Sequence, residues 1–386
     1  MKSNDLTILL TLKGRHLHTL RWLWHANRIR LPFHVIVADG EVHPTIDRLL
    51  SNPAIFPHLS FEYHRYNDKR LSDFYYKCVD ALKKVKTPYV MMCDNDDFVF
   101  PYGLMKSIAF LDSAPDYVCA GGGIPGFTII PQDASIAGVT GRFNRMRYRC
   151  FSDGSYLCRD IDSSSVALRA LGIIKNHLVV YYSIYRTQTL RTIAEEILAY
   201  NVNFRIHEIY WTVRTVTLGK VKSNPSYFSN FRQGNTSLNF GSKSDWVEHL
   251  LLRGFSEDFK VMATKVAHSV AQSDGCNQAE FEERFGEVYT DVLRNKLANT
   301  VMRYRFPLLF DLKQRFFSLR RPRLMPAWLR CWLDRKGLWR QLALDGASKE
   351  TIEAHLEELE EIEVTLQGRE FAEFISRNAP ELLAVV

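Results

Sequence analysis

The chain has 386 residues, of which 46% are hydrophobic and 24% charged, and it carries a net charge of +7. This length and composition predict a folded protein of two or three domains, because no low-complexity tract is present. No stretch reaches the roughly eighteen apolar residues of a spanning helix. The first twelve residues lack the apolar length and cleavage site of a secretory signal.

The seven cysteines form no C-x-x-C pair. The sequence therefore indicates neither a disulfide framework nor a zinc site. A reducing cytosol is the compartment that this cysteine usage favours.

The charge is unevenly distributed near the C-terminus. Residues 301–340 contain eleven basic and two acidic residues, whereas residues 341–386 contain three basic and eleven acidic ones. Such blocks predict separate structural roles for the two segments.

The first part of the chain alternates predicted strands and helices. Strands are expected at Leu6–Leu12, Phe33–Ala38, Leu59–Tyr63 and Tyr89–Cys93, with helices at Leu17–Trp24, His43–Leu50 and Phe74–Leu82. This order predicts a Rossmann-like, mostly parallel sheet with right-handed crossovers and flanking helices. The G-x-G-x-x-G fingerprint and the P-loop are both absent, which disfavours dinucleotide dehydrogenases and P-loop phosphotransferases.

An acidic turn follows the fourth predicted strand, where Asp94, Asp96 and Asp97 occupy three of four positions. Ligands of α/β proteins bind beyond the carboxyl ends of such strands, and carboxylates this close together favour a bound cation. Their oxygen ligands suit Mn²⁺ or Mg²⁺. We interpret the turn as a D-x-D metal site for a diphosphate-bearing substrate. The alternative is a turn that caps a helix beginning near Pro101.

Asp39 ends the second predicted strand, a position where a ribose or base is commonly bound. The alternative is an ordinary turn residue before Gly40.

The next part of the chain is expected to continue the α/β pattern. Further elements are predicted as a helix at Tyr102–Leu111, a strand at Asp116–Ala120, an irregular segment at 131–165, a strand at Leu178–Tyr185, a helix through Leu198 and a short strand at Gly219–Val221. The glycine run Gly121–Gly126 is either a close approach to a ligand or a flexible connector.

Residues 5–240 resemble a GT-A nucleotide-sugar-dependent glycosyltransferase of the family 2 type, in its bacterial branch. Thr11 and Arg15 match the first-strand signature, although Leu10, Lys13 and Gly14 depart from it. Asp39 matches the aspartate of the second strand. One bacterial branch of the family has a T-P-Y-V run followed by an acidic cluster, which this sequence matches at residues 87–97. Lys77, upstream of that run, stands where this branch often has a lysine. The resemblance implies that Thr11, Arg15, Asp39, Lys77 and Asp94 bind the nucleotide-diphosphate sugar.

The resemblance also implies a catalytic base. In the run from His207 to Arg214, Glu208 falls on the family's catalytic aspartate, and His207 replaces the acid before it. In inverting members that carboxylate removes the proton of the acceptor hydroxyl. The alternative is a first-turn glutamate favoured by the helix dipole.

The segment Tyr227–Ser237 resembles the closing Y-R-x-H-x-x-N-S segment of the family. Arg232 and Asn235 are expected to reach the diphosphate or the acceptor. Gln233 and Gly234 stand where the family has a histidine that often binds the metal.

We expect a GT-A domain at residues 1–240 and an α-helical C-terminal region at residues 241–386. Residues 301–344 interleave arginines with aromatic residues, which fits an interfacial membrane segment, a packed helical core or a nucleic-acid surface. The acidic helix expected at 349–367 packs on that segment, pairs with another subunit or stays solvated.

The resulting hypothesis is a metal-dependent glycosyltransferase, cytoplasmic or peripheral on the cytoplasmic membrane face. The resemblance implies a glycan or lipid-linked acceptor in bacterial surface polysaccharide or lipopolysaccharide synthesis, with no nucleic-acid partner. The rival hypotheses are a phosphohydrolase with Asp94 as nucleophile and Asp96 as acid and base, and a non-catalytic scaffold bound to membranes through 301–344.

Overall fold

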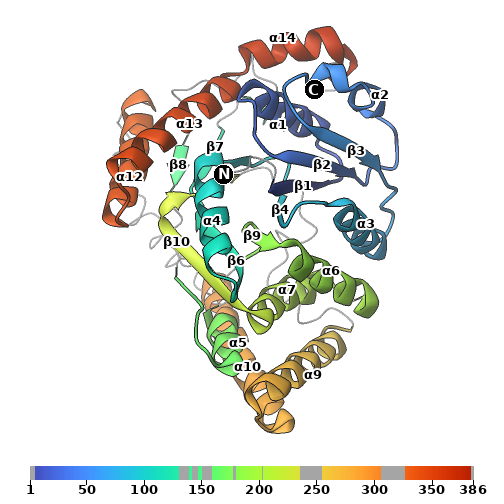
Figure 1. Ribbon diagram of the computed structural model, residues 1–386, viewed down its shortest axis with the longest axis vertical. Helices are drawn as coiled ribbons and strands as arrows, with labels where there is room; N and C mark the ends of the chain where they lie inside the picture. The colour runs from blue at the N-terminus through green and yellow to red at the C-terminus, as the bar shows by residue number, and fades with distance from the viewer. Residues whose placement is uncertain are drawn as a thin grey trace.

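Seven strands form the central sheet of the structure, a computed structural model (Figure 1). The structure describes residues 5–129, 139–140, 147–149, 159–176, 180–201, 203–234, 254–305 and 327–383. The strand order is β10-β6-β9-β4-β1-β2-β3. The predicted α/β class, with a mostly parallel sheet and a helical C-terminal region, is confirmed.

The predicted β-α-β order of the first part of the chain is confirmed. Its strands are β1 (Leu6–Leu12), β2 (His34–Asp39), β3 (Phe61–Arg65) and β4 (Tyr89–Cys93), and its helices are α1 (His16–Arg28), α2 (Asp47–Leu50) and α3 (Leu71–Lys84). All four strands pair in parallel. Every residue of β4 is buried, as its apolar sequence predicts for an interior strand. The helix expected from His43 is shorter than predicted and begins only at Asp47.

Three strands complete the sheet: β6 (Tyr117–Gly123), β9 (Ile184–Arg186) and β10 (Lys220–Phe228). β9 is antiparallel to both of its neighbours, β4 and β6. The strand expected over Leu178–Tyr185 was wrong in its bounds, because residues 181–183 form a turn before β9.

The glycine run belongs to the sheet. Residues Gly121 to Gly123 continue β6, so the run is not a flexible connector. A methyl group on Gly122 would collide with the backbone of Tyr227 in β10. Glycine is needed there because the two strands lie so close together. β10 extends over nine residues, well beyond the short strand expected at Gly219–Val221.

A second sheet joins the acidic turn to the segment that contains Arg232. It has the order β5 (Phe98–Val99), β11 (Asn230–Gln233), β7 (Gly126–Thr128) and β8 (Arg147–Arg149). Phe127 and Phe231 pack ring to ring at 4.6 Å between centroids, and Phe98 lies 5.8 Å from Phe127. These rings form a core with α12 (Ala327–Leu344) and α13 (Lys349–Gln367).

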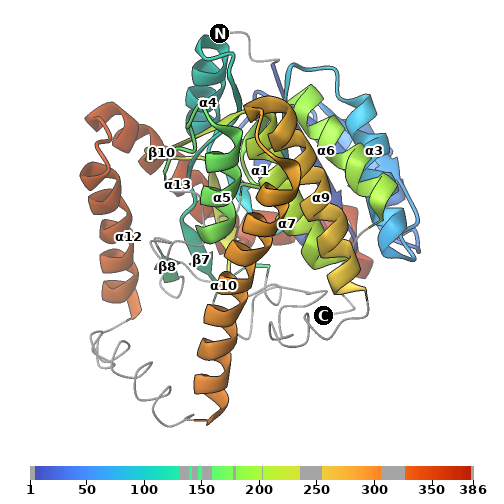
Figure 2. The ribbon, with the colours of Figure 1, turned by 90° about the horizontal axis from the view of Figure 1, so that it is seen from below.

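Helices cover both faces of the central sheet. The hydrophobic core on one face includes residues of α3, α5 (Val166–Asn176), α6 (Thr187–Tyr200), α7 (Phe204–Leu218), α9 (Phe255–Asp274) and α10 (Gln278–Arg305). The core on the other face includes residues of α1, α4 (Pro101–Ser113) and α14 (Arg369–Asn378). Figure 2 shows α5, α7, α9 and α10 gathered on the first of these faces. Within the described residues, no helix combines the length and apolarity that crossing a bilayer requires.

The acidic helix α13 spans the predicted residues 349–367 and packs against the N-terminal half of the chain. Its Thr365 hydroxyl bonds His25 Nδ1 of α1 at 2.8 Å, and His355 Nε2 accepts the backbone N–H of Phe228 at 3.0 Å. The Glu358 carboxylate accepts the Tyr102 N–H at 2.6 Å. The alternative of a solvated helix is therefore wrong. Residues 306–326 of the basic and aromatic segment lie outside the described residues.

The approach of α4 to β10 generates a stability prediction. A methyl group on Gly103 of α4 would run into the Phe228 backbone, which cannot move aside without disturbing β10. We expect Gly103→Ala to lower the free energy of unfolding by about 2 kcal/mol, measured by chemical denaturation. Gly286→Ala in α10 is the matched control, because nothing lies within 4 Å of its new methyl group.

The control substitution should raise the free energy of unfolding by about 0.5–1 kcal/mol, as expected for alanine in a helix. Equal stability of the two variants would contradict the close approach of α4 and β10.

Candidate functional site

Three neighbouring strands end side by side at one edge of the sheet. Leu12 of β1 is in register with Asp39 of β2, and Leu10 of β1 with Cys93 of β4. The turn after β4 therefore lies beside the turn after β1, in the position where α/β proteins bind ligands. This confirms the predicted placement of the acidic turn, and the candidate site is built on this edge.

The acidic turn is bonded to its neighbours through backbone and amide groups. Asn95 Nδ2 donates to Thr19 Oγ1 at 2.9 Å and to the Arg15 carbonyl at 3.3 Å. Asp97 Oδ1 accepts the Gln233 N–H at 2.9 Å. These bonds join the turn to α1 and to β11.

The alternative of an aspartate cap for the helix near Pro101 is wrong. The residue before α4 is Phe100, whose side chain makes no capping hydrogen bond. The N–H of Tyr102 in the first turn is bonded to Glu358 of α13. The contacts of the three aspartates therefore lie elsewhere, with Tyr182, Arg15 and Gln233.

Arg21 lies beneath the acidic turn and is fully buried. Its guanidinium donates to the Asp96 carbonyl at 2.8 Å and to the Val139 carbonyl at 2.7 Å, and lies 4.8 Å from the centre of the Phe98 ring. Burial lowers the pKa of Arg21 to about 10, while the charges of Asp96 and Asp97 oppose that shift. The side chain therefore stays protonated at neutral pH and places a fixed positive charge under the turn.

Asp94 and Asp97 have raised pKa values, because burial and the negative charge of Asp96 disfavour their ionised forms. The charge of Arg232 opposes both shifts. Asp94 accepts a hydrogen bond from the Tyr182 hydroxyl at 2.7 Å, whereas Asp97 Oδ2 is buried without a hydrogen-bond partner. Crowded carboxylates with an unsatisfied oxygen fit a divalent cation.

The three aspartates nevertheless point to different partners. Asp96 forms an ion pair with Arg15 at 2.6 Å. Across the described part of the chain, no three histidine, cysteine, aspartate or glutamate side chains converge as a metal cage. A divalent ion here would therefore use one or two carboxylates, with the other ligands supplied by a diphosphate and water.

Two arginines flank the acidic turn. Arg15 adopts a left-handed conformation with φ of 53° after Gly14, which is uncommon for a residue other than glycine. Arg232 of β11 lies over the Tyr182 ring, with its guanidinium carbon 5.0 Å from the ring centre. Two guanidinium groups close to clustered carboxylates can also bind phosphate oxygens. Asn235, predicted beside Arg232, lies outside the described residues.

Tyr181 lies in the turn before β9, next to Tyr182, whose hydroxyl donates to Asp94. Burial raises the pKa of the Tyr181 phenol, and the negative charges of Asp94 and Glu208 act in the same direction. Its ring lies 4.9 Å from that of Trp211 in α7, the helix that contains Glu208. The Tyr181 ring therefore contacts the helix that contains Glu208, while the adjacent Tyr182 contacts the acidic turn.

Sequence reasoning missed both Tyr181 and Tyr182. The pair was assigned to a strand over Leu178–Tyr185, in which adjacent side chains point to opposite faces. The only sequence signal was two adjacent tyrosines at the end of an apolar run. In the turn that forms instead, their rings lie 5.2 Å apart, with Tyr182 bonded to Asp94 and Tyr181 packed against Trp211.

The structure places Asp39 as a buried side chain at the end of β2. Its carboxylate accepts the Glu41 N–H at 2.9 Å, a bond that is typical of a turn residue, as the alternative predicted. It also accepts a hydrogen bond from the Tyr63 hydroxyl at 3.1 Å. Burial raises its pKa. Further inside, Lys77 forms an ion pair with Asp68 and donates to the Leu12 carbonyl at 2.9 Å.

Lys77 is fully buried, so it fixes Asp68 and the end of β1. A methyl group on Gly40 would collide with both Asp68 and Lys77. This part of the edge is consequently a tightly packed polar cluster next to Asp39.

Glu208 is exposed on α7, whereas the adjacent His207 is buried. The His207 ring lies among the rings of Phe74, Tyr75, Phe204 and Trp211, at centroid distances from 5.1 to 6.2 Å. Burial lowers the pKa of His207 to about 3, so it is neutral beside the predicted base.

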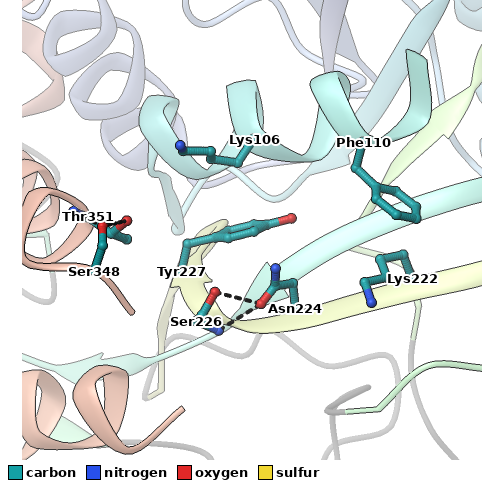
Figure 3. Close-up of a pocket in the computed structure, with 8 residues that line it drawn as sticks. All are labelled: Lys106, Phe110, Lys222, Asn224, Ser226, Tyr227, Ser348 and Thr351. Carbon is teal, nitrogen blue, oxygen red and sulfur yellow. Dashed lines mark hydrogen bonds between the residues drawn. The ribbon is translucent and has the colours of Figure 1, made fainter. Parts of the chain in front are cut away.

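A cavity of about 320 Å³ lies elsewhere, between α4, β10 and the start of α13 (Figure 3). Its lining residues are Lys106, Phe110, Lys222, Asn224, Ser226, Tyr227, Ser348 and Thr351. Their polar groups are largely bonded to protein, for example Lys222 to Asp160 at 2.6 Å and Tyr227 to Ser107 at 2.9 Å. None of the predicted site residues lines this cavity, so we place the candidate site at the carboxyl edge of the sheet.

No protein-family model and no curated protein matches the sequence. Among solved structures, S. aureus TarS 1–349 in complex with UDP-GlcNAc is 12% identical, with a TM-score of 0.45 over 95% of this chain and 92% of that one. The longer S. aureus TarS is 10% identical, with a TM-score of 0.43 over 94% of this chain and 55% of that one. This chain thus spans about half the length of the longer TarS chain.

A third structure is the mannosyltransferase PcManGT from Pyrobaculum calidifontis in complex with GDP-Man and Mn²⁺. It is 11% identical, with a TM-score of 0.38 over 88% of this chain and 86% of that one. Likenesses at these values carry no conclusion about function.

The buried His207 predicts a specific loss of stability in acid. In the unfolded chain its pKa is about 6.5. Between pH 6.5 and 3 the unfolded chain therefore binds a proton that the folded chain does not, and stability falls as the pH falls. From pH 7 to pH 5 this contribution is about 2 kcal/mol.

We expect His207→Leu to lose about 2 kcal/mol less stability than the wild type over that interval, measured by urea unfolding. His268→Gln on the exposed side of α9 serves as the control and should follow the wild type. Identical pH dependence of all three proteins would contradict the buried, neutral state of His207.

Proposed function

We propose that this chain is a glycosyltransferase that moves a sugar from a nucleotide-diphosphate sugar to a hydroxyl acceptor. The observation that carries the proposal is the acidic turn at the carboxyl edge of the sheet, where Asp97 Oδ2 is buried without a hydrogen-bond partner and Arg15 pairs with Asp96. A cation site for a diphosphate and a separate carboxylate for an acceptor proton are the two chemical parts that this transfer needs.

The nucleoside end of the donor is assigned to the β1 and β2 edge. Asp39 would accept hydrogen bonds from the ribose or base, with Thr11 beside it on the neighbouring strand. Lys77 would act through Asp68, since its ammonium group is buried against that carboxylate. Arg15 would lie next to the diphosphate through its position on Asp96.

The metal assignment is Mn²⁺ or Mg²⁺ bound by Asp96 with Asp94 or Asp97. The raised pKa values of Asp94 and Asp97 and the unsatisfied Asp97 Oδ2 support it, because a cation would stabilise these ionised carboxylates. The bound ion would offset the charge that develops on the leaving diphosphate. Arg232, with Asn235 nearby in sequence, would contact the diphosphate or the acceptor.

Glu208 is assigned as the general base. Its carboxylate would take the proton of the acceptor hydroxyl while the hydroxyl oxygen bonds to the anomeric carbon. The bond from that carbon to the diphosphate oxygen breaks in the same step, and the nucleoside diphosphate leaves with the electron pair. Attack from the face opposite the leaving group inverts the anomeric configuration. The neutral His207 next to Glu208 adds no charge of its own.

The biological setting is part of the proposal. We place the enzyme in the cytoplasm, or peripherally on the cytoplasmic membrane face, in bacterial surface polysaccharide or lipopolysaccharide synthesis. Its acceptor would be a glycan or a lipid-linked glycan. Residues 1–240 would contain the catalytic machinery, residues 241–386 would support it, and a homo-oligomer is compatible with this arrangement.

Donor and metal binding are tested together by thermal shift. We expect a nucleoside diphosphate or nucleotide sugar, among a panel, to raise the melting temperature by several degrees with Mn²⁺ and much less without it. Asp96→Asn should abolish the Mn²⁺-dependent part, because Asp96 is the carboxylate that both arrangements of the metal site use.

Asp291→Asn on the exposed face of α10 is the control and should retain the full ligand response. Stabilisation that is equal with and without chelator would remove the metal role. Release of phosphate from simple phosphoesters without any acceptor would instead favour the phosphohydrolase hypothesis.

The base assignment is tested by Glu208→Gln in a transfer assay with the donor found above. We expect turnover to fall by roughly 100-fold or more, because general bases contribute about that much. Donor-induced stabilisation should be unchanged, since Glu208 is not assigned to the nucleotide. Glu195→Gln, an exposed position on α6, is the matched control.

A Glu208→Gln enzyme with wild-type turnover would eliminate the assigned base. The anomeric configuration of the product, read by NMR, tests inversion independently.

A further inference from the structure

Helix α12 presents large apolar side chains to solvent. Trp332, Leu333 and Leu344 are 47%, 42% and 71% exposed. The other large apolar side chains exposed in the described part of the chain are scattered over five helices: Tyr76, Met105, Leu168, Val261 and Val301. Scattered apolar residues are normal on a protein surface, whereas a concentration on one helix indicates a contact surface.

The opposite side of α12 is packed against the protein. Cys331, Leu338 and Leu342 are buried in the core that α12 shares with α13 and the second sheet. Arg335 adds ion pairs to Glu360 at 3.0 Å and to Glu363 at 3.3 Å. Because this side is fixed, the exposed apolar side chains are fixed in their outward orientation.

Basic residues share the outward side with these apolar residues. Lys336 and Arg340 are exposed, and Lys336 Nζ lies 3.8 Å from the centre of the Trp332 ring. Neither of them is ion-paired with a carboxylate among the described residues. Asp334, the one acidic residue of α12, is only half exposed. The outward side of α12 is therefore both apolar and positively charged.

We propose that the outward side of α12, defined by Trp332, Leu333, Lys336, Arg340 and Leu344, docks on an anionic lipid surface. A helix with tryptophan and leucine beside lysine and arginine binds at the lipid–water boundary, with its axis in the plane of the surface. The positive charges meet anionic headgroups while the apolar side chains enter the boundary. In both views, α12 lies at the periphery of the molecule, where a flat surface can reach it (Figures 1 and 2).

This proposal goes beyond the proposed transfer reaction and stands independently of it. The sequence left the segment open between membrane, core and nucleic acid. In the structure the inward side of α12 is part of the core, whereas its outward side is exposed. Helix α12 can therefore be a core element on one side and a membrane-binding element on the other. Trp332 and Leu333 favour lipid over nucleic acid, because a nucleic-acid surface depends chiefly on basic residues that contact phosphates.

The test is flotation of the full chain with vesicles of phosphatidylcholine, with and without phosphatidylglycerol. We expect binding to the anionic vesicles, weakened by salt, and no binding to the neutral ones. Two double variants separate the contributions: Trp332→Ser with Leu333→Ser, and Lys336→Gln with Arg340→Gln. Each should weaken binding by roughly tenfold or more.

The matched control is Leu168→Ser with Lys175→Gln, which removes an exposed apolar and a basic residue from α5. It should float like the wild type. Circular dichroism and the melting temperature establish that every variant is folded, so a loss of binding is not a loss of structure.

Three outcomes would overturn the proposal: no flotation of the wild type, equal flotation of the α12 variants and the control, or equal binding to neutral vesicles. Two others would reassign the surface. If the wild type forms an oligomer that the α12 variants dissociate, and does not bind lipid, the surface is an interface between copies of the chain. If the protein binds single-stranded RNA but not vesicles, the surface binds nucleic acid.

Discussion

The crowding of three carboxylates in one turn, two of them buried, is the constraint on which the rest of the site depends. Burial and mutual repulsion disfavour the ionised forms of Asp94 and Asp97. The chain opposes this with three guanidinium groups. Arg15 at the start of α1 pairs with Asp96, Arg21 within α1 lies beneath the turn, and Arg232 comes from β11 of the second sheet. Leaving a buried charge without a partner typically destabilises a protein by about 3–5 kcal/mol, so these contacts fix where α1 and β11 lie.

The C-terminal helix α13 supports the elements that surround the acidic turn. The acidic turn leads through β5 into α4, whose first turn is bonded to Glu358 of α13. Helix α13 also bonds His25 of α1 and the Phe228 backbone of β10. Helix α13, which is far away in sequence, therefore stabilises the positions of α1 and α4 on either side of the acidic turn. In turn, α13 orients α12, whose outward side is left for another surface.

Most of the fold was predictable from hydrophobic pattern. The bounds of β1 and α13 are those expected, and β4 was recognisable as an interior strand because it is a continuous apolar run. The errors occurred where pattern is ambiguous. The two tyrosines at 181 and 182 favour a strand, yet they lie in a turn, and only residues 184–186 pair with β4 and β6.

The sequence by itself determined the residue types of the site and their order: a strand ending in three aspartates, a strand ending in Asp39, and a helix with Glu208. These follow from local pattern, since a strand's end and a helix's start depend on nearby residues. Only the tertiary structure decided which groups meet. It paired Arg15 with Asp96, Lys77 with Asp68, and Tyr182 with Asp94. Contacts of this kind depend on how strands align and helices pack, which no local pattern encodes.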